Sequence, residues 1–149
     1  MVDLVLRSAE EADLPLLAQM NRRLIEDEGS RNPMSVAQLQ ERMRGWLAEG
    51  YAARLFVEDG VRAVGYAVFR AYPDPYDPAQ QYVYLRQFYV ERTERRRGVG
   101  TRALALLCAQ LPKGATVALD VLTSNPAGQA FWRSVGCEPY CTTMHLKRG

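Results

Sequence analysis

The stretch "ERRRGVGT", residues 94–101, decides how this sequence is interpreted, because it joins three arginines to a Gly-x-Gly pair at the start of a helix. Gly98 and Gly100 leave backbone N–H groups unshielded by side chains, and the helix dipole adds positive potential. The arginines add forked donors that suit phosphate oxygens. The stretch therefore predicts a local anion site, and such a site would fit a pyrophosphate.

A dinucleotide site is the first alternative for this loop. The segment "GVGTRA", residues 98–103, matches Gly-x-Gly-x-x-Ala, and Asp120 lies 20 residues after Gly100, where a ribose-binding acid is expected. In a dinucleotide-binding unit the glycines follow their strand almost directly, whereas here the seven residues 91–97 intervene. Only 29 residues of this sequence follow Asp120, too few for a second nucleotide-binding half. Both spacings disfavour the dinucleotide interpretation.

Composition predicts an ordinary globular protein with one domain over residues 1–149. Apolar residues make up 48% of the chain and charged residues 24%, and the net charge is only +2, which disfavours nucleic acid as a partner. The longest apolar run is too short to span a membrane. Three cysteines without a signal-peptide start indicate a reducing cytoplasm, and a single histidine without a Cys-x-x-Cys pair argues against a metal site.

The hydrophobic pattern predicts a mixed α+β chain. A first strand over residues 2–7 is followed by a helix after Asp13, and a second helix begins at the capping box of Ser35 and Gln38. Asp59-Gly60 predicts a hairpin between two strands. The remaining elements are a long strand over 81–90, a helix from Gly98 to Pro112, a buried strand over 115–121, a helix over 125–135, and one bent or two short strands over 137–146.

Two motifs about 25 residues apart carry a family resemblance. Arg95-Arg96-Arg97-Gly98-Val99-Gly100 fits the form Arg/Gln-x-x-Gly-x-Gly/Ala and follows a strand that ends in "FYV". The second motif is "NPAGQAFWRSVGC", residues 125–137. Together they resemble the GNAT superfamily of acyl-CoA-dependent N-acyltransferases, whose element order is similar from end to end. The resemblance implies a central mixed, mostly antiparallel sheet of six to seven strands with helices on both faces, splayed between its fourth and fifth strands.

The resemblance also implies where coenzyme A binds. The loop amides of the family hold the pyrophosphate, and the pantetheine arm enters the splay as if adding a strand. An amide at the end of the central strand usually donates to the thioester carbonyl. The asparagine of the second motif lies near the pantetheine or thiol and can cap its helix as well. The coenzyme A residues implied in this chain are Phe88, Tyr89, Val90, Arg95, Arg96, Arg97, Gly98, Val99, Gly100, Thr101, Asn125 and Trp132.

For catalysis, the resemblance implies direct attack of an amine on the thioester, so the proton of the amine needs a route. Many members carry a Glu six residues before the Val that ends the central strand, where this chain has Tyr84. Tyr84 could join a water relay or line the pocket. Trp132 replaces the usual Tyr acid, and an indole N–H is no useful acid at neutral pH, which leaves Tyr140 or solvent to protonate the thiolate.

The expected function is acetyl transfer from acetyl-CoA to a primary amine of a small molecule or peptide. Glu26, Asp27 and Glu28 could attract the cationic amine, and Arg86 or Arg31 could hold an acceptor carboxylate; a solvated helix end is the other interpretation of the three acids. The rival hypothesis is a non-catalytic acyl-CoA sensor, because a Glu at position 84 and a Tyr at position 132 are both missing. A homodimer is left open, and no membrane partner is expected.

Overall fold

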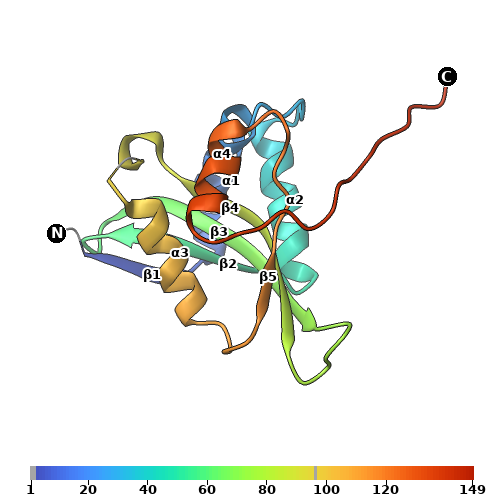
Figure 1. Cartoon of the computed structure of the whole chain (residues 1–149). Helices are drawn as coiled ribbons and strands as arrows, with labels where there is room; N and C mark the ends of the chain where they lie inside the picture. Colours follow the sequence, from blue (N-terminus) through green and yellow to red (C-terminus); the bar gives the residue numbers. More distant parts are fainter. Residues whose placement is uncertain (1–2, 96) are drawn as a thin grey trace.

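The computed structural model describes residues 3–95 and 97–149 and shows one sheet between two helical layers (Figure 1). Val2 of the predicted first strand and Arg96 of the loop lie outside the described residues. In chain order the elements are β1 (Leu4–Ser8), a 3-10 turn (Glu11–Asp13), α1 (Leu14–Asp27), α2 (Val36–Ala48), β2 (Ala52–Glu58), β3 (Arg62–Pro73), β4 (Gln81–Val90), a 3-10 turn (Arg92–Glu94), α3 (Val99–Ala109), β5 (Thr116–Ala118) and α4 (Pro126–Ser134).

The sheet has the strand order β1-β2-β3-β4-β5, with antiparallel pairs up to β4 and a parallel pair between β4 and β5. The mixed, mostly antiparallel sheet of the sequence prediction is confirmed, and β4 has the predicted bounds. The strand count is corrected from six or seven to five. The difference lies in the tail, because residues 137–149 form no strand in this structure.

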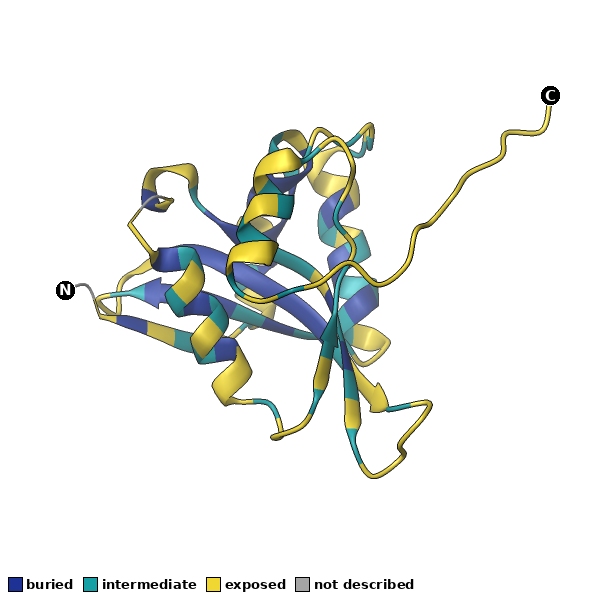
Figure 2. Ribbon diagram, in the orientation of Figure 1, coloured by how far each residue is buried: buried dark blue, intermediate teal, exposed yellow. Residues whose placement is uncertain are grey.

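Helices cover both faces of the sheet, as expected. Leu17 and Met20 of α1 and Trp46 of α2 pack with Tyr66 and other residues on one face. On the other face, Val99, Ala103 and Leu107 of α3 pack against strand residues such as Phe56 and Val83. Figure 2 shows the buried positions gathered in the sheet and in the helix faces turned toward it. Among the described helices, none is both long and apolar enough to cross a membrane.

The cleft arises from two irregularities of β4. The β3–β4 register pairs Val68 with Gln87 and Phe69 with Leu85, so Arg86 is an extra residue in a β-bulge. The parallel pairing with β5 covers only Tyr82 to Tyr84 of β4 and ends at Ala118. Within the described part of the chain, the β5-facing edge of residues 85–90 therefore has no strand opposite it, which agrees with the predicted splay between the fourth and fifth strands.

A glycine on β3 makes the bulged end of β4 possible. A Cβ atom at Gly65 would lie 2.1 Å from the carbonyl oxygen of Tyr89, and backbone cannot move aside as a side chain can. We expect Gly65→Ala to destabilise the protein by about 1–3 kcal/mol, the usual effect of overpacking, and thermal unfolding measures it. Gly45→Ala is the matched control, because no atom lies within 4 Å of its Cβ and alanine favours helix α2. A Gly65→Ala protein as stable as the wild type would contradict this packing.

Candidate active site

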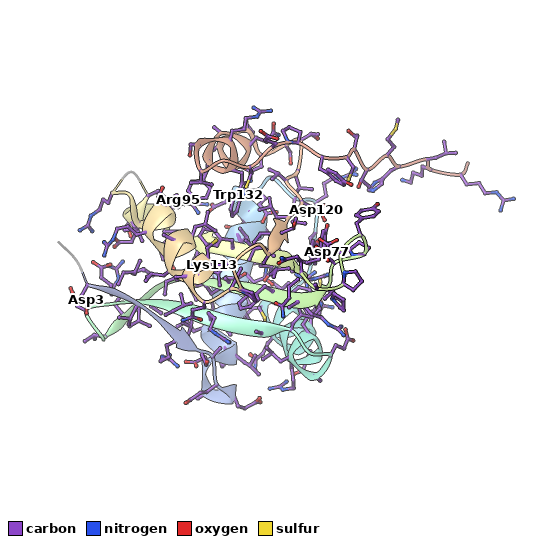
Figure 3. All side chains as sticks on the ribbon, turned by 60° about the horizontal axis from the view of Figure 1, so that its bottom comes forward. Asp3, Asp77, Arg95, Lys113, Asp120 and Trp132 are labelled. Carbon is purple, nitrogen blue, oxygen red and sulfur yellow. The ribbon has the colours of Figure 1, made fainter. Side chains whose placement is uncertain are left out.

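The splay opens into a cleft with a volume of about 340 Å³. Its walls come from five parts of the chain: the C-terminal end of α1, the last residues of β4, the start of α3, the segment after β5, and α4. In Figure 3 the labelled Arg95, Trp132 and Asp120 belong to three of these walls. The lining residues are Leu24, Asp27, Glu28, Leu85, Arg86, Gln87, Phe88, Tyr89, Val90, Arg95, Gly100, Leu119, Asp120, Val121, Leu122, Asn125, Ala127, Gly128, Phe131 and Trp132.

At one end of the cleft, the glycine loop begins α3. Gly98 has a φ of +74°, a left-handed conformation that glycine adopts without strain, and it is the N-cap of the helix. The carbonyl of Gly98 accepts from the N–H of Arg102 at 3.1 Å. The N–H groups of Val99, Gly100 and Thr101 lie in the first turn and have no intrahelical acceptor. The loop therefore presents a row of backbone donors with the positive end of the helix dipole behind them.

Two arginines of the loop, Arg95 and Arg97, help to hold its shape. Arg95 donates to the carbonyl of Val90 at 2.9 Å and forms an ion pair of 2.5 Å with Asp27. Arg97 pairs at 2.8 Å with Glu94, a buried carboxylate that Arg62 also contacts at 2.8 Å. The sequence prediction left one or more arginine side chains free to reach a phosphate. In the structure Arg95 and Arg97 have carboxylate partners, whereas Arg96 lies outside the described residues, and contact of any of these side chains with a phosphate stays a prediction.

Further ion pairs tie the loop to α1. Arg92 shares the carboxylate of Asp27 with Arg95, and Arg23 pairs with Glu91 at 2.5 Å. These contacts join residues more than 60 positions apart in the sequence. They fix the loop against the helix that forms the opposite wall of the cleft, so both walls keep a defined separation.

An aromatic wall lines the middle of the cleft. The rings of Phe88 and Phe131 stack at 6.1 Å, and Trp132 meets both rings edge-on at 5.3 and 4.9 Å. A Cβ atom at Gly100 would lie 3.2 Å from the ring of Phe131, so the second loop glycine lets α3 and α4 approach closely. Asn125 caps α4 by accepting from the N–H of Gly128 at 2.9 Å and also lines the cleft.

The polar end of the cleft carries Asp120, and a second carboxylate, Glu28, also lines the cleft. The phenol of Tyr84 donates to Asp120 at 2.8 Å, just where β4 and β5 separate. Burial and this hydrogen bond raise the pKa of Tyr84 to about 12. Burial and the nearby Asp27 raise the pKa of Glu28 above its ordinary value. The cleft thus holds one carboxylate oriented by a phenol and a second one that is half-buried.

A cluster of cationic and aromatic side chains, Arg42, Trp46 and Arg86, lies near Tyr84. Trp46 lies between two guanidinium groups, those of Arg42 and Arg86, each 4.5 Å from its ring centre. The bulge in β4 turns both Arg86 and Gln87 toward this face, where Gln87 accepts from the phenol of Tyr66 at 2.9 Å. Arg86 also lines the cleft. A bound carboxylate would find a positive partner here.

The structure brings most, but not all, of the sequence-predicted residues together. In the cleft lie Phe88, Tyr89, Val90, Arg95, Gly100, Asn125, Trp132, Glu28 and Arg86. Tyr84 reaches it through Asp120. Tyr140 lies on the exposed tail, with 87% of its surface accessible, and Glu26 is at the surface beside Arg22 at 3.8 Å. Val99 is buried in the core, which leaves only its amide for a ligand.

Sequence reasoning missed the roles of two carboxylates of the cleft, Asp120 and Asp27, along with several of its apolar lining residues. The sequence indicates Asp120 only as a possible ribose ligand, although a carboxylate within a predicted buried strand is a usable signal. Asp27 was grouped with Glu26 and Glu28 as an attraction for the amine, and it proves to be the anchor of Arg92 and Arg95. No local signal in the sequence points to that pairing.

Comparison with known proteins gives a consistent result. Residues 18–137 match the family model described as the acetyltransferase (GNAT) family. The fold is similar to that of an acetyltransferase from Trypanosoma brucei, with a TM-score of 0.68, 23% identity, and coverage of 98% of this chain and 100% of the other. Comparison with curated protein sequences gives no significant match.

Two further similar structures were solved with coenzyme A species. The aminoglycoside N-acetyltransferase AAC(6')-Iy in complex with CoA has a TM-score of 0.74 and 19% identity, covering 99% of this chain and 96% of the other. A predicted acetyltransferase from Clostridium acetobutylicum with acetyl-CoA has a TM-score of 0.73 and 18% identity, covering 97% and 96%. At these identities the likeness shows the fold alone.

Proposed function

This chain belongs to the GNAT acetyltransferase family and is an acyl-CoA-dependent acetyltransferase, and we propose that it transfers the acetyl group of acetyl-CoA to a primary amine of a small molecule or peptide. The observation that carries the proposal is the cleft between β4 and β5, which has anion donors at the start of α3 and a carboxylate, Asp120, held by Tyr84 at the point where β4 and β5 separate. A phosphate-bearing donor and a cationic acceptor would therefore enter from opposite ends.

The residues present fit coenzyme A. The first-turn amides of α3 form a cradle for an anion, with open space at the Cβ position of Gly98. The β5-facing edge of residues 85–90 offers backbone groups with no strand opposite, which suits the amide-bearing pantetheine arm. Phe88, Phe131 and Trp132 cover the apolar stretch between them. When bound, acetyl-CoA supplies an activated acetyl thioester to the polar end of this cleft.

The acceptor amine must lose a proton, because an alkylammonium with a pKa of about 10.4 is almost wholly charged at pH 7. Among the described residues, Glu28 has no hydrogen-bond partner that would compete with an ammonium group. Burial makes the charged carboxylate of Glu28 costly, and a bound ammonium group would offset that cost. Asp120 then accepts the proton, held in place by the phenol of Tyr84. Asp120, from the segment after β5, thus takes the role of the base that Tyr84 on the central strand cannot fill.

The remaining steps concern the thioester carbonyl and the thiolate. A backbone N–H on the open edge of residues 85–90 donates to the developing oxyanion. Trp132 lines this part of the cleft, and its indole N–H cannot act as an acid at neutral pH. Tyr140 lies on the exposed tail, outside the cleft. The thiolate leaves without a side-chain acid, because a thiol with a pKa of about 8.5 is a reasonable leaving group.

A thiol-release assay tests the proposal. The full chain is incubated with acetyl-CoA and a panel of primary amines that includes amino acids, polyamines, aminoglycosides and peptides with free N-termini or lysines. The expected result is thiol release that depends on one class of amine, with an acetylated amine identified by mass spectrometry. Tight binding of acetyl-CoA with no acetylated product from any amine would contradict the proposal and favour a sensor.

A further inference from the structure

The C-terminal third of the chain lacks a core of its own. Among the described residues, none after Leu107 is fully buried, and α4 has no buried residue. Strand β5 pairs with β4 on one side, and no strand in the described part of the chain pairs with its other side. Apolar residues of this half, such as Val117, Leu119 and Trp132, are only partly buried. An open strand edge beside a half-covered helix is a surface that natural proteins normally cover.

The tail has the pattern of the missing strand. Residues 138–149 are exposed throughout, and Tyr140, Met144 and Leu146 expose 87%, 87% and 96% of their surface. In a strand, Tyr140, Thr142, Met144 and Leu146 would share one face, and Cys141, Thr143, His145 and Lys147 would share the other. This period of two places one apolar face along a strand, and Tyr and Thr favour strands. The sequence predicted strand structure here, and the tail has found no partner within its own chain.

The tail also points away from its own sheet. Gly136 turns the chain after α4 with a φ of +101°, and the rest of the tail extends outward from the body to the C-terminal residue (Figure 1). In Figure 2 this arm is exposed along its whole length. The apolar tail of one copy could pair with the open edge of β5 in a second copy. In a dimer with two-fold symmetry, both tails and both open edges would be paired at once.

We propose that two copies of this chain form a dimer in which the tail of each, residues 138–149, pairs with β5 of the other and lies against its α4. The pairing adds a sixth strand to each sheet through main-chain hydrogen bonds, and the Tyr140–Met144–Leu146 face supplies the apolar contact.

The contact area is sufficient. An unfolded chain exposes about 1.45 Å² per dalton, or roughly 1,900 Å² for a twelve-residue arm. Burying half of that gives each tail about the 800 Å² per partner found in stable interfaces. The proposal concerns assembly and stands independently of the acceptor chemistry.

The first test is the oligomeric state of the full chain by sedimentation and light scattering. The wild type should be a dimer, and the double variant Met144→Asp with Leu146→Asp should weaken dimerisation at least 100-fold without loss of secondary structure. The matched control, Thr143→Asp with His145→Asp, places the same charges on the opposite face and should stay dimeric. A monomeric wild type, or equal weakening by both double variants, would overturn the proposal.

A mixing experiment separates exchange between copies from folding back within one copy. One chain carries Thr116→Cys on β5 with Cys108, Cys137 and Cys141 changed to Ser, and the other keeps Cys141 as its only cysteine. After the two chains are unfolded together, refolded and oxidised, a mixed disulfide between them should appear on a non-reducing gel. As a check on register, Ala118→Cys replaces Thr116→Cys. If neither pair forms a mixed disulfide, the tail does not lie on the partner's β5 and the proposal fails.

Discussion

Replacing Gly98 with Glu should weaken acetyl-CoA binding by at least 100-fold while the protein remains folded. A Cβ atom at Gly98 would meet no protein atom within 4 Å, so the space beside the first-turn amides of α3 is open to the new side chain. A carboxylate there occupies the phosphate space and repels the pyrophosphate. Titration calorimetry with acetyl-CoA measures the loss.

Gly60→Glu is the matched control for this experiment. Gly60 has a φ of +72°, almost the same as the +74° of Gly98, and likewise has no atom within 4 Å of a Cβ. It lies in the β2–β3 hairpin, so the variant has the same backbone strain and the same added charge away from the loop. Gly60→Glu should bind acetyl-CoA like the wild type. If Gly98→Glu did so too, the loop would not be the pyrophosphate site.

Asp120→Asn should lower kcat by about 10²–10⁴-fold, the usual contribution of a general base. The amide keeps the hydrogen bond from Tyr84 but cannot accept the amine proton, so acetyl-CoA affinity should be unchanged. The variant should recover activity as pH approaches the amine pKa of about 10.4, where the acceptor loses its proton to solvent. Steady-state rates from pH 6 to 10 measure both effects.

Two further variants test the assignment of this proton route. Tyr84 has a pKa of about 12 and stays protonated throughout this range, so Tyr84→Phe should lower the rate modestly without changing the shape of the pH profile. Asp3→Asn, which removes an exposed carboxylate near the N-terminus and outside the cleft lining, should have no effect. An Asp120→Asn enzyme with wild-type kcat at pH 7 would exclude Asp120 as the base.

The parts of the fold that sequence reasoning predicted are those set by local chemistry. The Ser35–Gln38 capping box starts α2 as expected, and the aromatic and β-branched run over 81–90 is β4 with those bounds. Gly98 begins α3 because only the left-handed conformation fits its turn. Each of these features depends on residues within a few positions of one another.

What the sequence could not reveal depends on contacts between distant segments. The pairing of Asp27 with Arg95 spans 68 residues and gives Arg95 a role in anchoring the loop that the sequence alone does not indicate. The approach of Tyr84 to Asp120 depends on where β4 and β5 separate, which no local pattern encodes. The tail has a strand-like alternation, yet a strand needs a neighbouring edge, and its own sheet does not pair with it.

The most direct test of the central claim is a crystal structure of the full chain with acetyl-CoA. We expect pyrophosphate oxygens within hydrogen-bond distance of the amides of residues 98–101, the pantetheine arm along residues 85–90, and the acetyl group between Phe88 and the Tyr84–Asp120 pair. Acetyl-CoA bound outside the β4–β5 cleft, or with its pyrophosphate away from the start of α3, would contradict it.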